Sequence, residues 1–292
     1  MILAIDLGGT KLQYAIFNEA YGQERPLETF QVPTQKNFLS QLKDAVLDCT
    51  ARYSAVSVVA IGVPGPTYDN VMQGSRPLNC VQNVNFSQAL AQFNLPLIIR
   101  NDLHMAAHCE LYQGVGQEHK NFCLVSFSTG IGVAAVNNGI ILEGRIEMGH
   151  QIFFPDFAPP QPCTNHQNCW AALASGNGIE NRFGTDQHNT TTDIFTHVLT
   201  DADLSELQQI NAQAFGNLIN AYDPEIIVVM GSLGIEQFDL IMPAADQVEK
   251  YSINRPIPTI IRSTSGNDIG LTGAYYAARN ALIPTSEDEG KQ

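Results

Sequence analysis

The chain opens with Ile2-Leu3-Ala4-Ile5-Asp6-Leu7-Gly8-Gly9-Thr10-Lys11, in which apolar residues lead into an aspartate, two glycines, a hydroxyl and a lysine. The residues that follow, 12–17, alternate between apolar and polar well enough for a second strand. The pattern therefore predicts a strand, a Gly-Gly turn and a second strand.

This hairpin is a candidate phosphate-binding turn. Common phosphate loops run from a strand into a helix and use the N-terminus of that helix, which a hairpin lacks. The hairpin offers instead the backbone N–H groups of Gly8 and Gly9, the Thr10 hydroxyl, and Asp6 at a strand end to hold a magnesium ion or its water. The alternative is an ordinary hairpin, because Gly-Gly is a favoured two-residue loop.

The composition is that of a globular protein with an acidic surface. The 292 residues, 44% apolar and 15% charged, are enough for one large or two medium domains. The net charge of −14 repels a phosphate backbone, so we expect no nucleic-acid partner. A small anionic ligand would need local hydrogen-bond donors.

No segment of the sequence has the character of a membrane span or a signal peptide. Apolar runs stay short of the roughly 18 to 20 residues that a span requires, and the N-terminus has no charged flank. We therefore expect a cytoplasmic protein with no membrane partner. Four cysteines lie among apolar neighbours, as buried thiols usually do: Cys49, Cys80, Cys109 and Cys123.

The first half alternates between helical and strand patterns. An apolar stripe at helical spacing predicts a helix within 36–53, and the apolar run 56–63 predicts a buried strand that stops at Pro64-Gly65-Pro66. Residues 97–100 predict another strand, which ends at Asn101-Asp102. This alternation indicates an α/β domain with its functional residues at strand ends.

The second half begins near residue 120 and repeats the opening pattern. A strand at 122–127 runs into Ser128-Thr129-Gly130-Ile131-Gly132, followed by strands at 133–136 and 140–142. Two such hairpins predict a duplicated domain pair with a cleft between the two turns, each half gripping one end of a polyphosphate.

Further along, the sequence predicts a helix, a strand and a second small-residue helix. The helix spans 201–222, with acidic residues in its first turn, and the strand 225–230 ends in a turn at Gly231-Ser232-Leu233-Gly234. The small-residue helix includes 273–278, and we expect the acidic tail, 284–292, to be disordered.

A cluster of metal-binding residue types stands in the second half. Cys163, His166 and Cys169 follow one another at short spacing, and His150 lies just upstream. Four ligands of Cys2His2 type suit a tetrahedral structural zinc, which would organise a loop rather than take part in chemistry. The alternative is that these residues fall together by chance.

Asp102 is the candidate catalytic residue. As a carboxylate at a strand end, it could accept the proton of a sugar hydroxyl while a terminal phosphate transfers in line. The structural alternative is an N-cap of the helix predicted from 103, a role that Asn101 could also fill. We interpret His104 and His108 as residues on a helix face rather than ligands.

These residues resemble the ROK sugar kinases, a family within the actin-like ATPase superfamily, through nearly the whole chain. Residues 6–11 are similar to the family's first phosphate motif, and 128–132 to its second. Residues 231–234 stand where the family binds adenosine, and 268–274 resemble its closing helix motif. Asn101-Asp102 matches the pair whose aspartate is the family's general base, which favours the catalytic interpretation of Asp102.

The resemblance implies a two-domain actin-like (ribonuclease H-like) α/β ATPase fold with a cleft between the domains. We expect a small N-terminal α/β domain at 1–117 and a larger C-terminal α/β domain with the zinc loop at 118–283. We also expect a homodimer.

The resemblance also assigns three sets of site residues. Phosphate, nucleotide and magnesium binding falls to Asp6, Gly8, Gly9, Thr10, Lys11, Ser128, Thr129, Gly130, Gly231 and Ser232. Sugar binding falls to Gly65, Asn79, Asn101, Asp102, Glu147 and His150. Structural zinc falls to His150, Cys163, His166 and Cys169, whose Cys-x2-His-x2-Cys spacing resembles the variant seen in some fructokinase-like members.

The sequence departs from the family pattern at the sugar end. Family members usually carry Leu-Glu after the last cysteine, and that glutamate binds the sugar near its anomeric end, whereas this chain has Trp170-Ala171. Losing a charge-assisted hydrogen bond costs on the order of 1.5–3 kcal/mol, enough to change the preferred hexose. Residues 79–83 also lack the usual Gly-Trp, and the adenosine turn has one glycine fewer.

We therefore predict an ATP-dependent, glucokinase-like hexose kinase that phosphorylates the 6-OH of glucose or a related hexose, with Asp102 as base. The alternatives are fructokinase or N-acetylhexosamine kinase specificity, or a sugar-binding regulator with impaired catalysis. The family also includes transcriptional repressors, but those carry an N-terminal helix-turn-helix, whereas this chain starts in a strand at Ile2.

Overall fold

The computed structural model describes residues 1–18, 25–154, 156–266 and 268–282, and the expected acidic tail at 284–292 lies outside this range. Contacts divide the chain into two compact units. The first unit comprises Met1–Gly114, Glu143–Arg145 and the range from Ser265 onward, and the second comprises Val115–Leu142 and Ile146–Thr264.

The first unit is built on a five-stranded sheet with the order β3-β2-β1-β4-β8. Its strands are β1 (Ile2–Leu7), β2 (Lys11–Phe17), β3 (Glu28–Pro33), β4 (Val58–Val63) and β8 (Leu97–Asn101). β1 pairs antiparallel with β2 and parallel with β4, which pairs parallel with β8. The predicted hairpin is therefore present, and the ends of three parallel strands meet at one edge.

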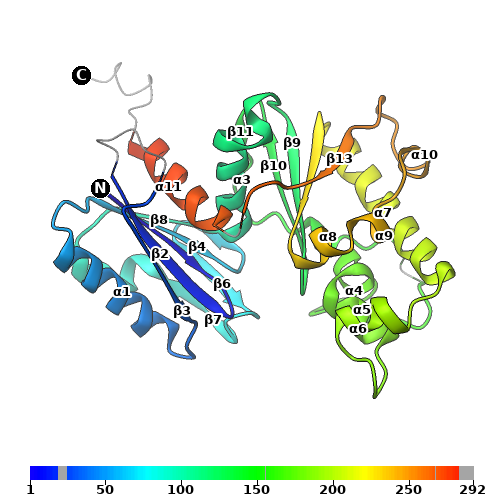
Figure 1. Cartoon of the computed structure of the whole chain (residues 1–292), viewed down its shortest axis with the longest axis horizontal. Helices are drawn as coiled ribbons and strands as arrows, with labels where there is room; N and C mark the ends of the chain where they lie inside the picture. The colour runs from blue at the N-terminus through cyan, green and yellow to red at the C-terminus, as the bar shows by residue number, and fades with distance from the viewer. Residues whose placement is uncertain (19–24, 155, 267, 283–292) are drawn as a thin grey trace. The chain divides into compact units, whose positions relative to one another are not determined.

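Helices cover both faces of this sheet (Figure 1). Leu3, Ile5 and Leu7 pack with α1 (Phe38–Arg52), whereas Ile2 and Ala4 pack with α11 (Ile269–Leu282). Because side chains alternate along a strand, each face of β1 belongs to one helical layer. α3 (Asp102–Gln113) lies against α11 and follows β8 directly.

A small sheet and short helices complete the first unit. The sheet has the order β5-β6-β7, and its register shifts between Gln73 and Ser75. Its elements and the neighbouring short helices are β5 (Thr67–Tyr68), β6 (Val71–Ser75), β7 (Cys80–Asn85), α2 (Phe86–Ala89) and η2 (Ala91–Phe93).

The second unit contains a five-stranded sheet with the order β11-β10-β9-β12-β13. Its strands are β9 (Phe122–Phe127), β10 (Ile131–Asn137), β11 (Ile140–Ile141), β12 (Ile226–Met230) and β13 (Thr259–Arg262). β9 pairs antiparallel with β10 and parallel with β12, which pairs parallel with β13. The second sheet therefore repeats the strand order and directions of the first unit's sheet.

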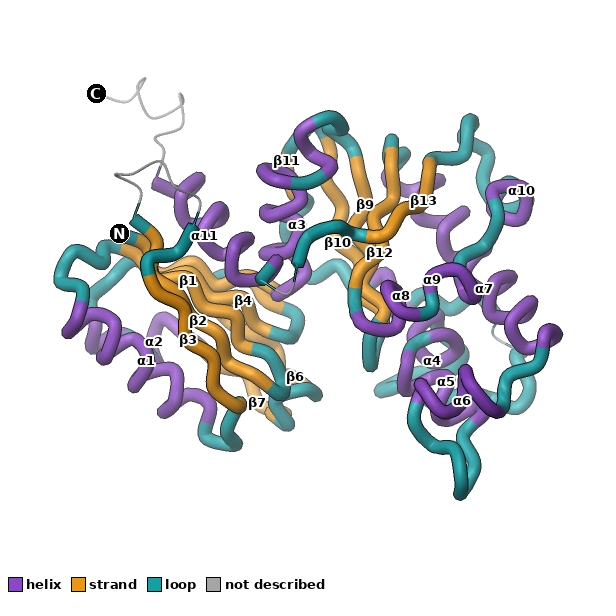
Figure 2. Tube along the Cα trace, viewed as in Figure 1, coloured by secondary structure: helices purple, strands orange, loops and turns teal. Residues whose placement is uncertain are grey.

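Helices of the second unit pack on one face of this sheet (Figure 2). The longest, α7 (Asp201–Tyr222), has the predicted bounds and begins with a capping box between Thr200 and Asp203. The other helical elements are η3 (Val115–Gln117), η4 (Met148–His150), α4 (Trp170–Ala174), α5 (Gly176–Phe183), α6 (Thr191–His197), α8 (Ser232–Glu236), α9 (Phe238–Ile241) and α10 (Ala245–Val248).

The two units differ from the two domain ranges that the sequence suggests. The C-terminal helix α11 falls within 118–283, yet its contacts are with α3, β1 and β4 of the first unit. Leu271, Ala274 and Tyr276 bury the apolar face of α11 against that sheet. Burial of this face places the helix in the first unit.

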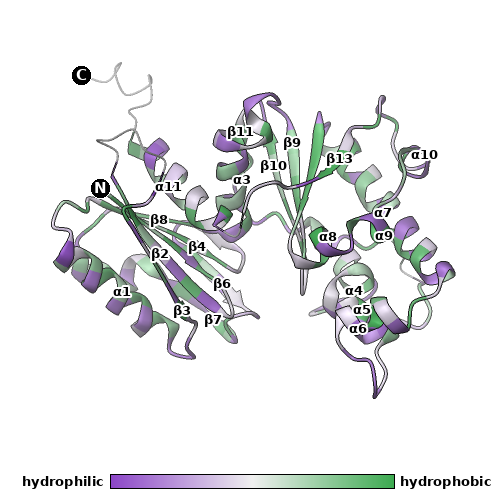
Figure 3. Ribbon diagram, viewed as in Figure 1, coloured by the Kyte–Doolittle hydropathy of each residue, from purple (hydrophilic) through white to green (hydrophobic). Residues whose placement is uncertain are grey.

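Apolar residues line the central strands of both sheets, whereas α1 carries green apolar and purple polar bands (Figure 3). Among the described residues, no helix combines the length and hydrophobicity needed to cross a bilayer.

Candidate functional site

The predicted phosphate turn of the first unit is held by its own backbone and by Thr34. The N–H of Gly8 donates to the carbonyl of Lys11 at 2.9 Å, and the Thr34 hydroxyl donates to the carbonyl of Gly8 at 2.7 Å. The N–H of Thr34 donates to the carbonyl of Thr10 at 3.0 Å. Sequence reasoning missed Thr34, because it reaches the turn only through the pairing of β3 with β2.

Asp6 lies at the carboxyl end of β1, beside the turn. Burial raises the pKa of Asp6, the positive charge of Lys11 lowers it, and the negative charge of Asp268 raises it. A Cβ added at Gly62 would lie 3.7 Å from both Oδ1 of Asp6 and Cα of Asp102. Asp6 and Asp102 therefore flank the same glycine at the end of β4.

Asn101, rather than Asp102, is the N-cap of α3. Its Oδ1 accepts a hydrogen bond from the N–H of Leu103 at 2.9 Å, and its Nδ2 donates to the carbonyl of Gly65 at 3.2 Å. Asp102 is the first residue of the helix, and its Oδ1 lies 2.8 Å from the same Leu103 nitrogen. The structure thus joins Gly65, Asn101 and Asp102 at the ends of β4 and β8.

Asn79 belongs to the loop between β6 and β7. Its φ of 50° is left-handed, a conformation that asparagine tolerates, and its N–H donates to the carbonyl of Arg76 at 2.9 Å. The loop is tied to the turn after β4, because the hydroxyl of Ser75 donates to the carbonyl of Pro64 at 2.6 Å. Sequence reasoning had no signal for Ser75.

The second predicted phosphate turn lies in the second unit and is joined to α5. The N–H of Gly176 donates to the carbonyl of Ser128 at 2.8 Å, and that of Asn177 to the carbonyl of Thr129 at 3.2 Å. These residues border a cavity of about 240 Å³, which Glu180, Ser232 and Glu236 also line. Oε1 of Glu180 accepts a hydrogen bond from the Thr191 hydroxyl at 2.7 Å. Sequence reasoning missed Asn177, Glu180 and Glu236.

The turn predicted at 231–234 is instead the start of helix α8. Gly231 precedes this helix with a φ of 84°, and a Cβ there would lie 2.2 Å from the carbonyl oxygen of Phe127. Only glycine allows both the positive φ and this close approach. Gly231 therefore brings Ser232 to the end of β9.

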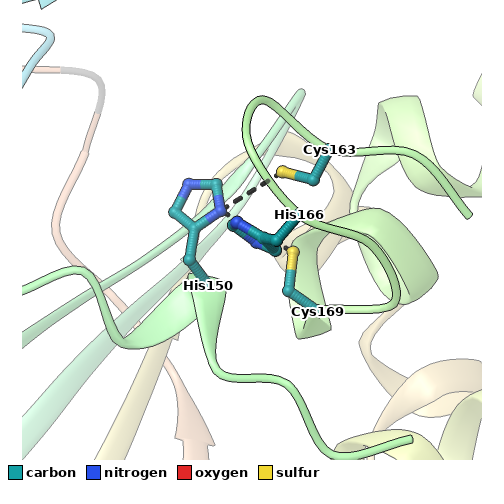
Figure 4. Close-up of side chains that lie close together, drawn as sticks. All are labelled: His150, Cys163, His166 and Cys169. Atoms are coloured by element: carbon teal, nitrogen blue, oxygen red, sulfur yellow. Dashed lines mark hydrogen bonds between the residues drawn. The ribbon is translucent and has the colours of Figure 1, made fainter. Parts of the chain in front are cut away.

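The four predicted zinc ligands converge within the second unit (Figure 4). Their ligand atoms all lie within 4.8 Å of one another, although His150 comes from η4, Cys163 and His166 from a loop, and Cys169 from the N-cap of α4. Nδ1 of His150 lies 3.3 Å from Sγ of Cys163 and 3.6 Å from Sγ of Cys169.

This arrangement fits a tetrahedral cation. Zinc bonds of about 2.0 Å to nitrogen and about 2.3 Å to sulfur place neighbouring ligand atoms about 3.5 Å apart. Nε2 of His166 is buried and, among the described residues, has no hydrogen-bond partner, so ligation would satisfy it. Burial raises the pKa of Cys169 to about 11, and a thiol in such surroundings ionises when a cation binds.

Glu147 stands at the start of η4, beside the metal cluster. A Cβ at Gly149 would lie 1.9 Å from the carbonyl oxygen of Ile131, so this glycine lets η4 press against β10. Neighbouring groups partly desolvate the Glu147 carboxylate and raise its pKa, although the residue itself remains exposed. The second unit thus presents the Glu147 carboxylate where a ligand can reach it.

Trp170 and Ala171 occupy the first turn of α4, where the resemblance expects Leu-Glu. Trp170 is fully buried, and its Nε1 donates to Oδ1 of Asn211 at 2.8 Å. Ala171 is 8% exposed and offers no polar atom of its side chain. Trp170 therefore does not replace the missing carboxylate.

His104 and His108 lie on α3 and are not part of the metal cluster. His104 is buried, and burial lowers its pKa. Burial lowers the pKa of His108 to about 4, and its Nδ1 has no hydrogen-bond partner among the described residues. Both imidazoles are therefore neutral near pH 7.

Known proteins resemble the chain over nearly its whole length. The model of the ROK family matches residues 2–281. A glucokinase of Halalkalibacterium halodurans is 25% identical, with 98% of each chain covered. An N-acetylmannosamine kinase of Escherichia coli is 29% identical, with 96% of this chain and 99% of that protein covered.

The fold also matches a solved structure. The crystal structure of a ROK family glucokinase from Streptomyces griseus, in complex with glucose and AMPPNP, has a TM-score of 0.71 at 23% identity. The match covers 96% of this chain and 99% of that one. With the family model covering residues 2–281, the chain belongs to the ROK family.

Proposed function

We propose that this protein transfers the terminal phosphate of ATP to a hydroxyl of a hexose, the 6-OH of glucose or a related sugar. The observation that carries the proposal is the position of Asp102. It flanks Gly62 together with Asp6, while Asn101 caps the helix. A base for the sugar hydroxyl and a carboxylate for magnesium thus stand at neighbouring strand ends.

In this proposal Asp102 accepts the proton of the sugar hydroxyl as its oxygen bonds to the terminal phosphorus. The bond between that phosphorus and the bridging oxygen breaks, and ADP leaves with the bonding electron pair. A magnesium ion bound at Asp6 would neutralise charge on the phosphate oxygens.

Hydroxyls of both predicted phosphate turns would bind the phosphates, together with backbone N–H groups other than those of Gly8 and Ser128, which donate within their own turns. The residues of these turns are Gly8, Gly9, Thr10, Lys11, Ser128, Thr129 and Gly130, with Gly231 and Ser232 for the nucleoside. The cavity bordered by Thr129 and Ser232 supports a nucleoside site in the second unit.

Sugar binding would fall to residues of both units. The first unit supplies Gly65, Asn79 and Asn101, and the second supplies Glu147 and His150. The hydrogen bond from Asn101 to Gly65 supports the first group, and the partly desolvated Glu147 carboxylate supports the second.

We propose a structural zinc at His150, Cys163, His166 and Cys169. Their spacing and the unpartnered Nε2 of His166 support it. A bound zinc would fix the loop that holds His150 next to Glu147. We further propose that the protein is cytoplasmic and forms a homodimer.

A second specificity has its own support. Ala171 leaves the sugar without the carboxylate expected near the anomeric end, which favours a sugar other than glucose. The N-acetylmannosamine kinase among the relatives makes an N-acetylhexosamine the leading second candidate, and fructose a third. A sugar-binding regulator with impaired catalysis is the remaining possibility.

The test is ATP turnover against glucose, mannose, fructose, N-acetylglucosamine and N-acetylmannosamine, with zinc and magnesium supplied. We expect ADP release with at least one sugar and a phosphomonoester on its terminal hydroxyl by ³¹P NMR. Sugar binding without turnover for the whole panel would refute the kinase and favour the regulator.

A further inference from the structure

Polar side chains form a row across three strands of the first unit. Asp6 on β1 pairs with Gln13 on β2, and Gln13 pairs with Gln31 on β3. Ala4 and Ala15, two positions from Asp6 and Gln13 on the same strands, pack with α11. Because side chains alternate, Asp6 and Gln13 also face the α11 side of the sheet.

The start of α11 covers this row and brings a second carboxylate. Nε2 of Gln13 donates to Oδ1 of Asp268 at 3.3 Å and to Oε1 of Gln31 at 3.0 Å. A Cβ at Gly270 would lie 2.9 Å from Oδ2 of Asp6, so the first turn of α11 sits directly over that carboxylate. The amide of Gln13 therefore holds Asp268 at the strand position next to Asp6.

The side-chain oxygen of Gln13 indicates that a ligand binds beside Asp6 and Asp268. Gln13 is 4% exposed, and its Oε1 is buried without a hydrogen-bond partner among the described residues. A buried acceptor without a donor costs about 1–3 kcal/mol and calls for an explanation. Ionised carboxylates at Asp6 and Asp268 would supply no proton, whereas a water on a cation bound between them would supply the missing donor.

We propose that Asp268 is a second carboxylate of the divalent-cation site and that Gln13 positions it. The set of Asp6, Asp268 and the Gln13 amide oxygen consists of hard oxygen donors, which magnesium and manganese prefer. Magnesium keeps several of its waters, and one of them would donate to Oε1 of Gln13. Asp268 is exposed, so a hydrated ion reaches it from solvent.

This inference rests on the proposed function for the magnesium role of Asp6, but its test does not need a sugar. The probe is Mn²⁺ alone, titrated into the full chain, with free Mn²⁺ followed by electron paramagnetic resonance. The variants are Asp268→Asn, Asp268→Glu and Gln13→Met. The matched control is Asp44→Asn, which neutralises an exposed carboxylate on α1 of the same unit.

We expect Asp268→Asn and Gln13→Met to weaken Mn²⁺ binding about ten-fold or more, with Asp44→Asn unchanged. Asp268→Glu keeps the charge and should retain more affinity than Asp268→Asn. Circular dichroism and the unfolding temperature establish that each variant is folded. A role of Asp268 limited to starting α11 would lower the unfolding temperature without changing Mn²⁺ affinity.

Unchanged Mn²⁺ affinity in both folded Asp268 variants would overturn the inference, even if the enzyme phosphorylates a hexose. Conversely, weakened Mn²⁺ binding in Asp268→Asn would support it even if no sugar is turned over, in which case only the proposed function fails.

Discussion

The indole Nε1 of Trp170 donates to Oδ1 of Asn211 at 2.8 Å inside the second unit. The indole packs edge-on against Phe127 and Phe215, and Nδ2 of Asn211 donates to the carbonyl of Ile241 at 2.9 Å. The polar side-chain atoms of Trp170 and Asn211 are thus all hydrogen-bonded inside the core. The residue that follows the last cysteine is structural here, and Ala171 alone marks the position of the expected glutamate.

Trp170→Phe should lower the free energy of unfolding by about 1–3 kcal/mol, because it leaves Oδ1 of Asn211 buried without a donor. Urea denaturation followed by circular dichroism measures the change. The order of preference among hexoses should stay the same. An altered order in a folded variant would mean that Trp170 acts on the sugar after all.

Ala171→Glu should improve the use of glucose. It places a carboxylate where the family resemblance implies one near the anomeric end of the sugar, and a charge-assisted hydrogen bond corresponds to a KM lower by about ten-fold or more. Ala171→Gln is the matched control, and its gain should be smaller because neutral hydrogen bonds are weaker. No change in KM for any aldohexose, in a variant with a normal unfolding temperature, would contradict the specificity argument.

Removal of zinc should destabilise the second unit. We expect one zinc per chain by elemental analysis, and its loss on chelation or in Cys169→Ser should lower the unfolding temperature by roughly 5 °C or more. Cys80→Ser is the control, because Cys80 belongs to the first unit and is not part of the metal cluster. A protein without bound metal and with a chelator-insensitive unfolding temperature would eliminate the zinc centre.

Asp102→Asn should lower kcat about 10²- to 10⁴-fold, because the amide cannot accept the proton of the sugar hydroxyl. Sugar affinity by calorimetry and the unfolding temperature should stay close to wild type, since Asn101 holds the helix cap. Asn101→Ala, by comparison, should cost about 1 kcal/mol of stability. If Asp102→Asn unfolded the protein instead, Asp102 would be a structural residue.

The protein should lose stability in mild acid. Burial lowers the pKa of His108 from 6.5 to about 4, so between these values the unfolded chain binds a proton that the folded chain does not. The free energy of unfolding should therefore fall as the pH drops from about 6.5 to about 4, by up to roughly 3 kcal/mol, and this contribution then levels off.

His108→Gln should flatten this pH dependence, measured by urea denaturation at a series of pH values. Part of the slope should remain, because burial also lowers the pKa of His104. His197→Gln, at an exposed position on α6, should keep the full slope. A wild-type protein with constant stability between pH 7 and pH 4 would contradict the partly buried, neutral state of His108.

Local pattern was enough to predict both hairpins and the helix 201–222. Strand alternation, the Gly-Gly turn and the acidic first turn depend on neighbours in the chain, so β1, β2, β9, β10 and α7 appear where the sequence predicts them. The four metal-ligand residues were also identifiable, because Cys and His at short spacing are chemically distinctive.

Contacts between distant segments decided the rest. The sequence alone could not place α11 on β1, bring Asp268 to Gln13, or turn Trp170 toward Asn211, because burial and hydrogen bonding across many residues set these positions. The opening stretch Asp6–Lys11 determined by itself that a hairpin forms and which groups it offers. Only the tertiary structure decided that the first turn of α11 covers Asp6, because the apolar face of that helix is buried against this sheet.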